Sequence, residues 1–123
     1  QEKYRSKLNI HFGIELGLQP HLANSLNELL KTIPFDFVIG SSHVVHGYDP
    51  YYGMFFENRE ESACYREYFE SILENLNAFS GLDVYGHIDY MVRIRTENIP
   101  MNVIRIFWMR FYAQSLTKIS ESN

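Results

Sequence analysis

Three separated segments of the chain share one pattern, in which a short apolar run ends at a side chain that can bind a metal ion. They are residues 10–15, 35–43 and 82–89. Apolar, β-branched runs of this length are typical of short buried strands. The metal-capable side chains are Glu15, His43 and His87. The pattern predicts a small sheet whose strands present these three groups near their C-terminal ends.

The segments between these runs have helical character. Apolar residues recur at helical spacing over residues 21–32, and again over residues 60–79. Pro34 ends the first predicted helix and Gly81 marks the end of the second. Residues 46–59, rich in Gly, Pro, Asp and Tyr, are predicted to form a long loop. The predicted order is therefore β-α-β-α-β.

This order predicts an α/β fold in which parallel strands alternate with helices, so that the C-terminal ends of the strands meet at one edge. In (β/α) barrels that edge carries the chemistry. We therefore expect Glu15, His43 and His87 to point into one shared cavity. One carboxylate and two neutral imidazoles form a zinc- or iron-type ligand set with a position left open for water. The alternatives are a solvent-facing carboxylate and two histidines that cap turns or lie hydrogen-bonded in the core.

Charge and composition argue against nucleic acid and membranes as binding partners. The chain has 123 residues and a net charge of −4, and it has no basic stripe of the kind that binds nucleic acid. It contains neither an apolar run long enough to span a bilayer nor a signal-peptide pattern, so we expect no membrane partner and a cytoplasmic location. The single cysteine, Cys64, is expected to be a small buried residue. Because the chain begins at Gln1, we expect a piece of a longer protein.

The residues around the three predicted ligands resemble consecutive motifs of the histidinol-phosphatases in the PHP (polymerase and histidinol phosphatase) superfamily. The motifs are Gly13-Ile14-Glu15-Leu16-Gly17, the run from Asp36 to Gly47 that contains Gly40-Ser41-Ser42-His43, and Asp83-Val84-Tyr85-Gly86-His87-Ile88-Asp89-Tyr90. Further similarity lies at residues 49–52 and 65–70, and the resemblance runs from about residue 4 to residue 93 without a gap. Three motifs in the family's order and spacing are more specific than any one of them.

The resemblance implies a partial PHP-type (β/α)7 barrel, with residues 1–93 as its central part. It implies hydrolysis of L-histidinol phosphate to L-histidinol and phosphate, in histidine biosynthesis, with divalent zinc, manganese or iron ions as cofactors. It also implies that Glu15 bridges two metal ions and that His43 and His87 bind one of them. A PHP phosphoesterase that acts on another small phosphorylated metabolite is the alternative within the superfamily.

Three further residues are candidates for supporting roles. Arg93 follows the third predicted strand, where its guanidinium could hold a substrate phosphate by paired hydrogen bonds. His46 lies on the long loop and is predicted to contact substrate, with a solvated histidine as the alternative. Asp89 is predicted either to orient a ligand histidine by a hydrogen bond or to cap the turn that follows.

The ends of the chain depart from the family. We find no counterpart of the family's first His-x-His motif or of its closing Asp-x-His motif, so we expect weak or absent phosphatase activity. We interpret residues 94–123 as a tail translated in a shifted reading frame after a one-base deletion near codon 94. When the codons of residues 107–109 are read from two bases later, they encode Leu-Asp, as in the family. A divergent amphipathic helix is the alternative, and the coding DNA decides between them. A non-catalytic fragment that self-associates through exposed sheet edges is the alternative function class.

Overall fold

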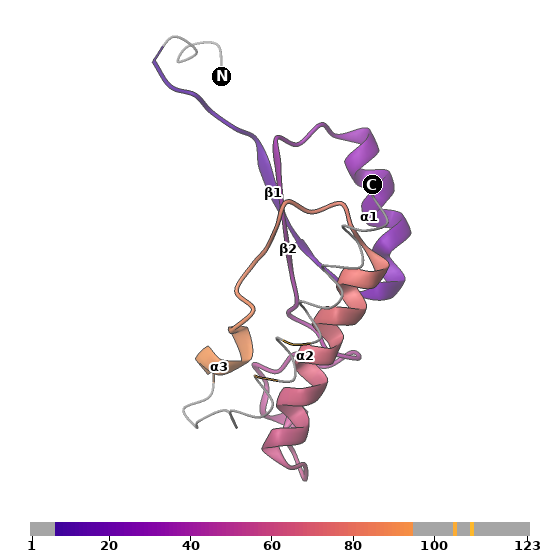
Figure 1. Ribbon diagram of the computed structural model, residues 1–123, viewed down its shortest axis with the longest axis vertical. Coiled ribbons are helices and arrows are strands. Elements are labelled where there is room, and N and C mark those ends of the chain that lie inside the picture. Colours follow the sequence, from indigo (N-terminus) through magenta and orange to yellow (C-terminus); the bar gives the residue numbers. More distant parts are fainter. Residues whose placement is uncertain (1–6, 95–104, 106–108, 110–123) are drawn as a thin grey trace.

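The secondary structure alternates between strands and helices. The computed structural model describes residues 7–94, 105 and 109. Along the chain it contains β1 (Gly13–Gly17), a short 3-10 helix (Pro20–Leu22), α1 (Ala23–Thr32), β2 (Phe37–Ser41), a second 3-10 helix (Gly53–Phe55), α2 (Glu61–Ala78), β3 (Val84–Tyr85) and α3 (Tyr90–Ile94) (Figure 1). The predicted α/β class and both long helices are confirmed.

The three strands form one parallel sheet in the order β1-β2-β3. Glu15 lies opposite Ile39 on β2, and Ile39 lies opposite Val84 on β3. The order along the sheet is therefore the order along the chain, as expected for successive strand-helix-strand units.

An aspartate fixes the register at the start of each strand pair. Asp36 donates its backbone N–H to the carbonyl of Phe12 at 2.7 Å, and its carboxylate accepts the N–H of Phe12 at 2.7 Å. Asp83 repeats the arrangement with Val38, at 2.9 Å and 2.7 Å. Because each aspartate holds one residue of the preceding segment at two points, a one-residue slip would break both bonds. We call these two contacts the aspartate clamps.

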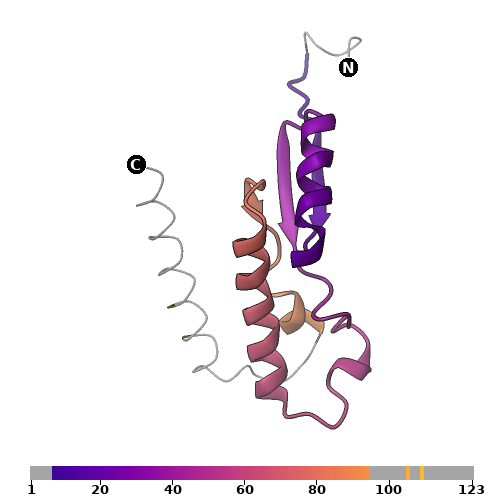
Figure 2. The same cartoon turned by 90° about the vertical axis from the view of Figure 1, so that its right-hand side faces the viewer.

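Helices cover one face of the sheet. Leu16 and Val38 are buried together with Ala23 of α1 and with Phe79, which follows α2. In Figure 1 both long helices lie to one side of the strands, and Figure 2, viewed from that side, shows α1 in front of β1 and β2. The side chains that alternate with Leu16 and Val38 point to the opposite face, which we call the open face. There Val84 is 43% exposed.

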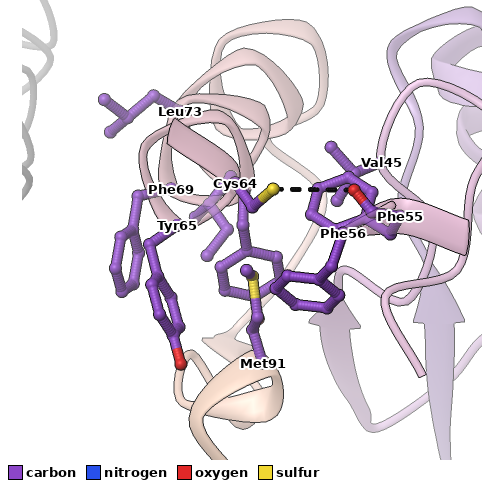
Figure 3. Close-up of a cluster of buried hydrophobic side chains, with 10 residues drawn as sticks. Val45, Phe55, Phe56, Cys64, Tyr65, Phe69, Leu73 and Met91 are labelled. Atoms are coloured by element: carbon purple, nitrogen blue, oxygen red, sulfur yellow. Dashed lines mark hydrogen bonds between the residues drawn. The ribbon is translucent and has the colours of Figure 1, made fainter. Parts of the chain in front are cut away.

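A second apolar cluster packs the long loop against α2. Val45, Phe55 and Phe56 from the loop side form one buried cluster with Cys64 and Tyr65 of α2, and Figure 3 shows them beside Cys64. The predicted burial of Cys64 is confirmed, since its side chain is fully buried and its Sγ donates to the carbonyl of Phe55 at 3.5 Å. Loop 46–59 is therefore anchored to α2 by Phe55 and Phe56.

Two strand predictions need correction. The first strand was predicted at residues 10–15, but β1 spans Gly13–Gly17, so Glu15 lies at its middle and not at its C-terminal end. The third was predicted at residues 82–89, but β3 contains only Val84–Tyr85. The apolar run is longer than the paired segment in both cases, because strand bounds depend on which residues find a hydrogen-bonded neighbour.

The part of the chain that the structure describes contains no helix long and apolar enough to cross a membrane. Apart from Ile94, Arg105 and Met109, the predicted tail 94–123 lies outside the described residues, so the frameshift remains a hypothesis.

Candidate metal centre

Glu15 projects from the middle of β1 onto the open face. Its Oε1 accepts hydrogen bonds from Ser41 Oγ at 2.9 Å and from His87 Nε2 at 3.1 Å. These two hydrogen bonds, that from Ser41 first, lower the pKa of the Glu15 carboxyl below its ordinary value. The carboxylate is therefore held ionised and oriented while its side chain stays 46% exposed.

His43 and His87 each follow the end of a strand by two residues. His43 lies beyond β2 and His87 beyond β3. Their rings are 4.8 Å apart between centroids, and their Nε2 atoms approach to 3.2 Å. The backbone of His87 has a φ of 28°, in the left-handed region that non-glycine residues rarely adopt. Strained backbone of this kind concentrates at functional sites.

The three predicted ligands therefore converge in space. One ligand atom from each of Glu15, His43 and His87 lies within 4.8 Å of the others. The separations are 3.1 Å from Glu15 Oε1 to His87 Nε2, 3.2 Å between the two Nε2 atoms, and 4.0 Å from Glu15 Oε1 to His43 Nε2. Ligand atoms of a tetrahedral zinc ion lie about 3.3 Å apart, given bonds of about 2.0–2.1 Å. The donor set and its spacing fit a zinc ion with one position left for water.

The ring of Tyr90 borders both histidines. It meets His43 edge-on at 5.2 Å between centroids and His87 at 5.6 Å. Its hydroxyl donates to Asp49 Oδ1 at 3.1 Å. Burial, followed by this bond to Asp49, raises the pKa of Tyr90 to about 12. Tyr90 therefore forms a neutral wall beside the two imidazoles.

Asp89 and Arg93 bind each other in the structure. Arg93 Nε on α3 lies 3.4 Å from Oδ1 of Asp89, the residue immediately before α3, and both side chains are more than half exposed. No hydrogen bond joins Asp89 to either ligand histidine among the described residues, and His87 Nδ1 is buried there without a partner. The predicted hydrogen bond from Asp89 to a ligand histidine is thus absent. The Asp89 carboxylate instead pairs with Arg93, whose guanidinium was predicted to hold the phosphate.

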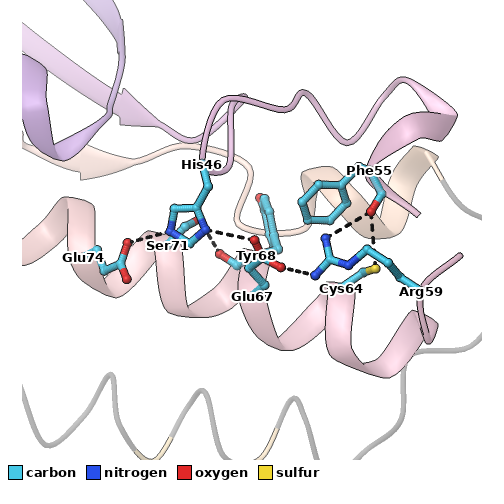
Figure 4. Close-up of polar contacts among 8 residues, drawn as sticks. All are labelled: His46, Phe55, Arg59, Cys64, Glu67, Tyr68, Ser71 and Glu74. Carbon is cyan, nitrogen blue, oxygen red and sulfur yellow. Dashed lines mark hydrogen bonds and ion pairs between the residues drawn. The ribbon is translucent and has the colours of Figure 1, made fainter. Parts of the chain in front are cut away.

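His46 lies against α2. Its Nδ1 is 2.9 Å from Glu67 Oε1, and its Nε2 is 3.2 Å from Glu74 Oε2 (Figure 4). These hydrogen bonds, that to Glu67 first, raise the pKa of His46 above its ordinary value. Glu67 also pairs with Arg59. The predicted substrate contact by His46 stays a prediction, and the observed contacts give it the role of fastening the loop to α2.

Ser41 belongs to the site although the sequence analysis gave it no role. It is fully buried on β2 and donates to Glu15. Strand alternation could have identified it, because Ser41 precedes His43 by two residues and so faces the same side. The partners of His46 gave no comparable signal, since they lie on a helix more than 20 residues away.

Known proteins resemble this chain in sequence. It is 30% identical over 94 residues to a histidinol-phosphatase of Lactococcus lactis subsp. lactis, a match that covers 76% of this chain and 35% of the relative. It is 29% identical over 91 residues to a probable histidinol-phosphatase of Clostridium acetobutylicum, covering 74% of this chain and 35% of the relative. The chain thus spans about a third of the length of these relatives.

The fold also resembles a solved structure. The crystal structure of histidinol phosphate phosphatase from Lactococcus lactis, complexed with zinc, L-histidinol and phosphate, matches with a TM-score of 0.76 and 28% sequence identity. The match covers 87% of this chain and 42% of that one. In addition, the family model described as the PHP domain matches residues 1–118. The chain therefore belongs to the PHP domain family.

Proposed function

We propose that this chain contributes to a metal-dependent phosphomonoester hydrolase that converts L-histidinol phosphate and water to L-histidinol and phosphate. The observation that carries the proposal is the convergence of Glu15, His43 and His87 within 4.8 Å. The similar structure with zinc, L-histidinol and phosphate supports the choice of metal and substrate.

Glu15 Oε1, His43 Nε2 and His87 Nε2 would hold the metal ion. Once bound, a zinc, manganese or iron ion supplies a hydroxide near neutral pH and stabilises the charge that develops on the phosphoryl oxygens. Both described contacts of the Glu15 carboxylate use Oε1. The Glu15 carboxylate would thus keep a second oxygen with which it could also hold a second ion.

The chain's own residues orient these ligands and receive the substrate. Ser41 holds the Glu15 carboxylate in place at 2.9 Å. Arg93 would exchange its exposed partner Asp89 for the substrate phosphate, at small cost because exposed ion pairs contribute only about 0–1 kcal/mol. Support for a substrate contact by His46 is weaker, because two carboxylates on α2 already bind its ring and would repel a phosphate.

One observation favours a non-catalytic, self-associating fragment as the second candidate. The open face exposes Val84 and also Phe37, which is 44% exposed at the start of β2. Apolar side chains on an uncovered sheet face promote association. The third candidate function is that of a PHP phosphoesterase with another substrate.

The test measures zinc content and phosphate release by the full chain. We expect one zinc ion per chain and at most weak metal-dependent phosphate release from L-histidinol phosphate, because the chain lacks counterparts of the family's first and closing motifs. Zinc binding and any phosphate release should be lost in His43→Ala. His21→Ala is the matched control, since His21 is an exposed histidine on the 3-10 helix before α1. Zinc binding retained in His43→Ala would contradict the proposed ligands. Release of phosphate from other monoesters alone would favour the third candidate.

A further inference from the structure

A buried polar cluster lies on the helix-covered face, behind the candidate ligands. It consists of Asn75 on α2, Ser42 after β2, and Tyr85 on β3. Asn75 Nδ2 donates to Ser42 Oγ at 2.6 Å, and Ser42 Oγ hydrogen-bonds the Tyr85 hydroxyl. Ser42 is fully buried and Asn75 is 2% exposed. The three residues link α2 to the C-terminal ends of the neighbouring strands β2 and β3.

The two cluster residues that belong to the sheet segments, Ser42 and Tyr85, are close in sequence to the candidate ligands. Ser42 immediately precedes His43, and Tyr85 precedes His87 by two residues. Alternation along β2 sends Ser42 toward the helices and His43 toward the open face. In addition, Gly86, which follows β3, donates its backbone N–H to the carbonyl of Gly40 in β2 at 2.8 Å and so holds the two strand ends together. The cluster therefore joins the two segments that carry the imidazoles, on the side away from the ligand atoms.

Stability alone is a poor reason for a buried amide at this position. Asn75 follows Ile72 and Leu73 in the buried stripe of α2, where an apolar side chain would pack without losing hydrogen bonds to water. Its Oδ1 is buried with no partner among the described residues, which costs free energy. Buried polar networks can instead specify one geometry. The geometry that this network can specify is the separation of the β2 and β3 ends.

We propose that Asn75 is a positioning residue that acts through Ser42 and Tyr85 to set the separation of the His43 and His87 imidazoles. The metal-binding consequence rests on the proposed function, whereas the positioning of the two rings does not. Loss of residues that orient metal ligands typically weakens metal binding about 10–100-fold. Asn75 acts one residue further from the ligands, so we expect a change of about tenfold, at the lower end of that range.

The test uses the full chain with Asn75→Leu, which removes the amide at similar volume, and Tyr85→Phe, which removes only a hydroxyl. Ser71→Ala is the matched control: Ser71 is buried one turn from Asn75 on α2, but its hydroxyl donates to the Tyr68 carbonyl of the same helix. Two quantities are measured, namely the imidazole 15N resonances of the metal-free chain and the zinc affinity by competition with a chromogenic chelator. Thermal melting shows that each variant is folded.

We expect Asn75→Leu and Tyr85→Phe to shift the resonances of His43 and His87, to leave those of the exposed His11 and His21 in place, and to weaken zinc binding about tenfold. Ser71→Ala should change neither quantity. Folded variants with unchanged His43 and His87 resonances would overturn the positioning role even if zinc binds normally. Shifted resonances in a chain that binds no zinc would support the positioning role and refute the proposed function.

Discussion

At the scale of single residues, one carboxylate oxygen organises the candidate site. Glu15 Oε1 accepts hydrogen bonds from both the Ser41 hydroxyl and His87 Nε2. An amide at this position would keep the shape of the side chain but remove the negative charge that a divalent cation requires. The site's affinity for metal should therefore depend on the charge of Glu15 and not on its volume.

We expect Glu15→Gln to weaken zinc binding by more than the roughly 10–100-fold that is typical for residues supporting a ligand, because a ligand itself is lost. Chelator competition measures the affinity. Glu28→Gln is the control, since Glu28 is an exposed glutamate on α1 that pairs with Lys31. Zinc affinity in Glu15→Gln equal to that of the control would rule out Glu15 as a ligand.

His46 gives a pH-dependent contribution to stability. Its pKa is raised by Glu67 and then by Glu74, so the folded chain binds the proton more tightly than the unfolded chain. The stabilisation is fully present below the unfolded pKa of about 6.5 and is lost as pH rises through the higher folded pKa. Because the His46 side chain is 52% exposed, the effect should be about 0.2–1 kcal/mol.

Urea denaturation at pH 6 and at pH 9 measures this contribution. The original chain should lose more free energy of unfolding between these pH values than His46→Gln does. His21→Gln should behave as the original chain, since His21 has no ion pair among the contacts of the described residues. An equal loss in all three chains would assign the pH dependence to other groups.

At the scale of elements, the aspartate clamps determine which residues pair. Asp83 accepts the Val38 N–H and returns its own N–H to the Val38 carbonyl. Since β3 has only two residues, this clamp supplies much of its attachment to β2. The position of His87 depends on that attachment.

We expect Asp83→Ala to reduce the free energy of unfolding by about 1.5–3 kcal/mol, the range for hydrogen bonds to a charged group. Asp89→Ala removes a carboxylate that forms an exposed ion pair with Arg93 of α3, and it should cost less than about 1 kcal/mol. Urea denaturation distinguishes the two. If both variants lost equally little, β3 would be held by other contacts.

The sequence predicts the elements better than their bounds. Alternating apolar runs and helical stripes were sufficient to predict the order of elements, the parallel sheet and the grouping of Glu15, His43 and His87. They did not predict that the run starting at Ile10 pairs with β2 only from Gly13, because the register depends on the distant Asp36 clamp. The contacts of His46 and Asp89 depend on the path of a loop and on a short helix, and neither has a periodic signal.

At the scale of the whole molecule, the open face and the sheet edges predict self-association. Among the described residues, β1 and β3 each pair on one side only. Val84 and Phe37 add exposed apolar surface to the same sheet. Unpaired edges beside exposed apolar side chains allow strands from another copy to add on.

Sedimentation velocity over a range of protein concentrations measures this association. We expect the chain to form concentration-dependent oligomers, and Val84→Lys to shift it toward monomer, because a charge on an edge strand opposes pairing. Met54→Lys is the control, since Met54 is 67% exposed on the loop away from the strands. A monomer at every concentration would exclude the open face as an interface.

The order of the strands also has a consequence for the kinetics of folding. Each strand lies beside the one made just before it, and each aspartate clamp joins a new strand to a segment that already exists. Contacts between neighbouring segments require short loop closures, which favour fast folding. Successive units could therefore add during synthesis at the ribosome, with β2 docking on β1 before residues 82–89 emerge. The pair of ligand histidines would then be completed last.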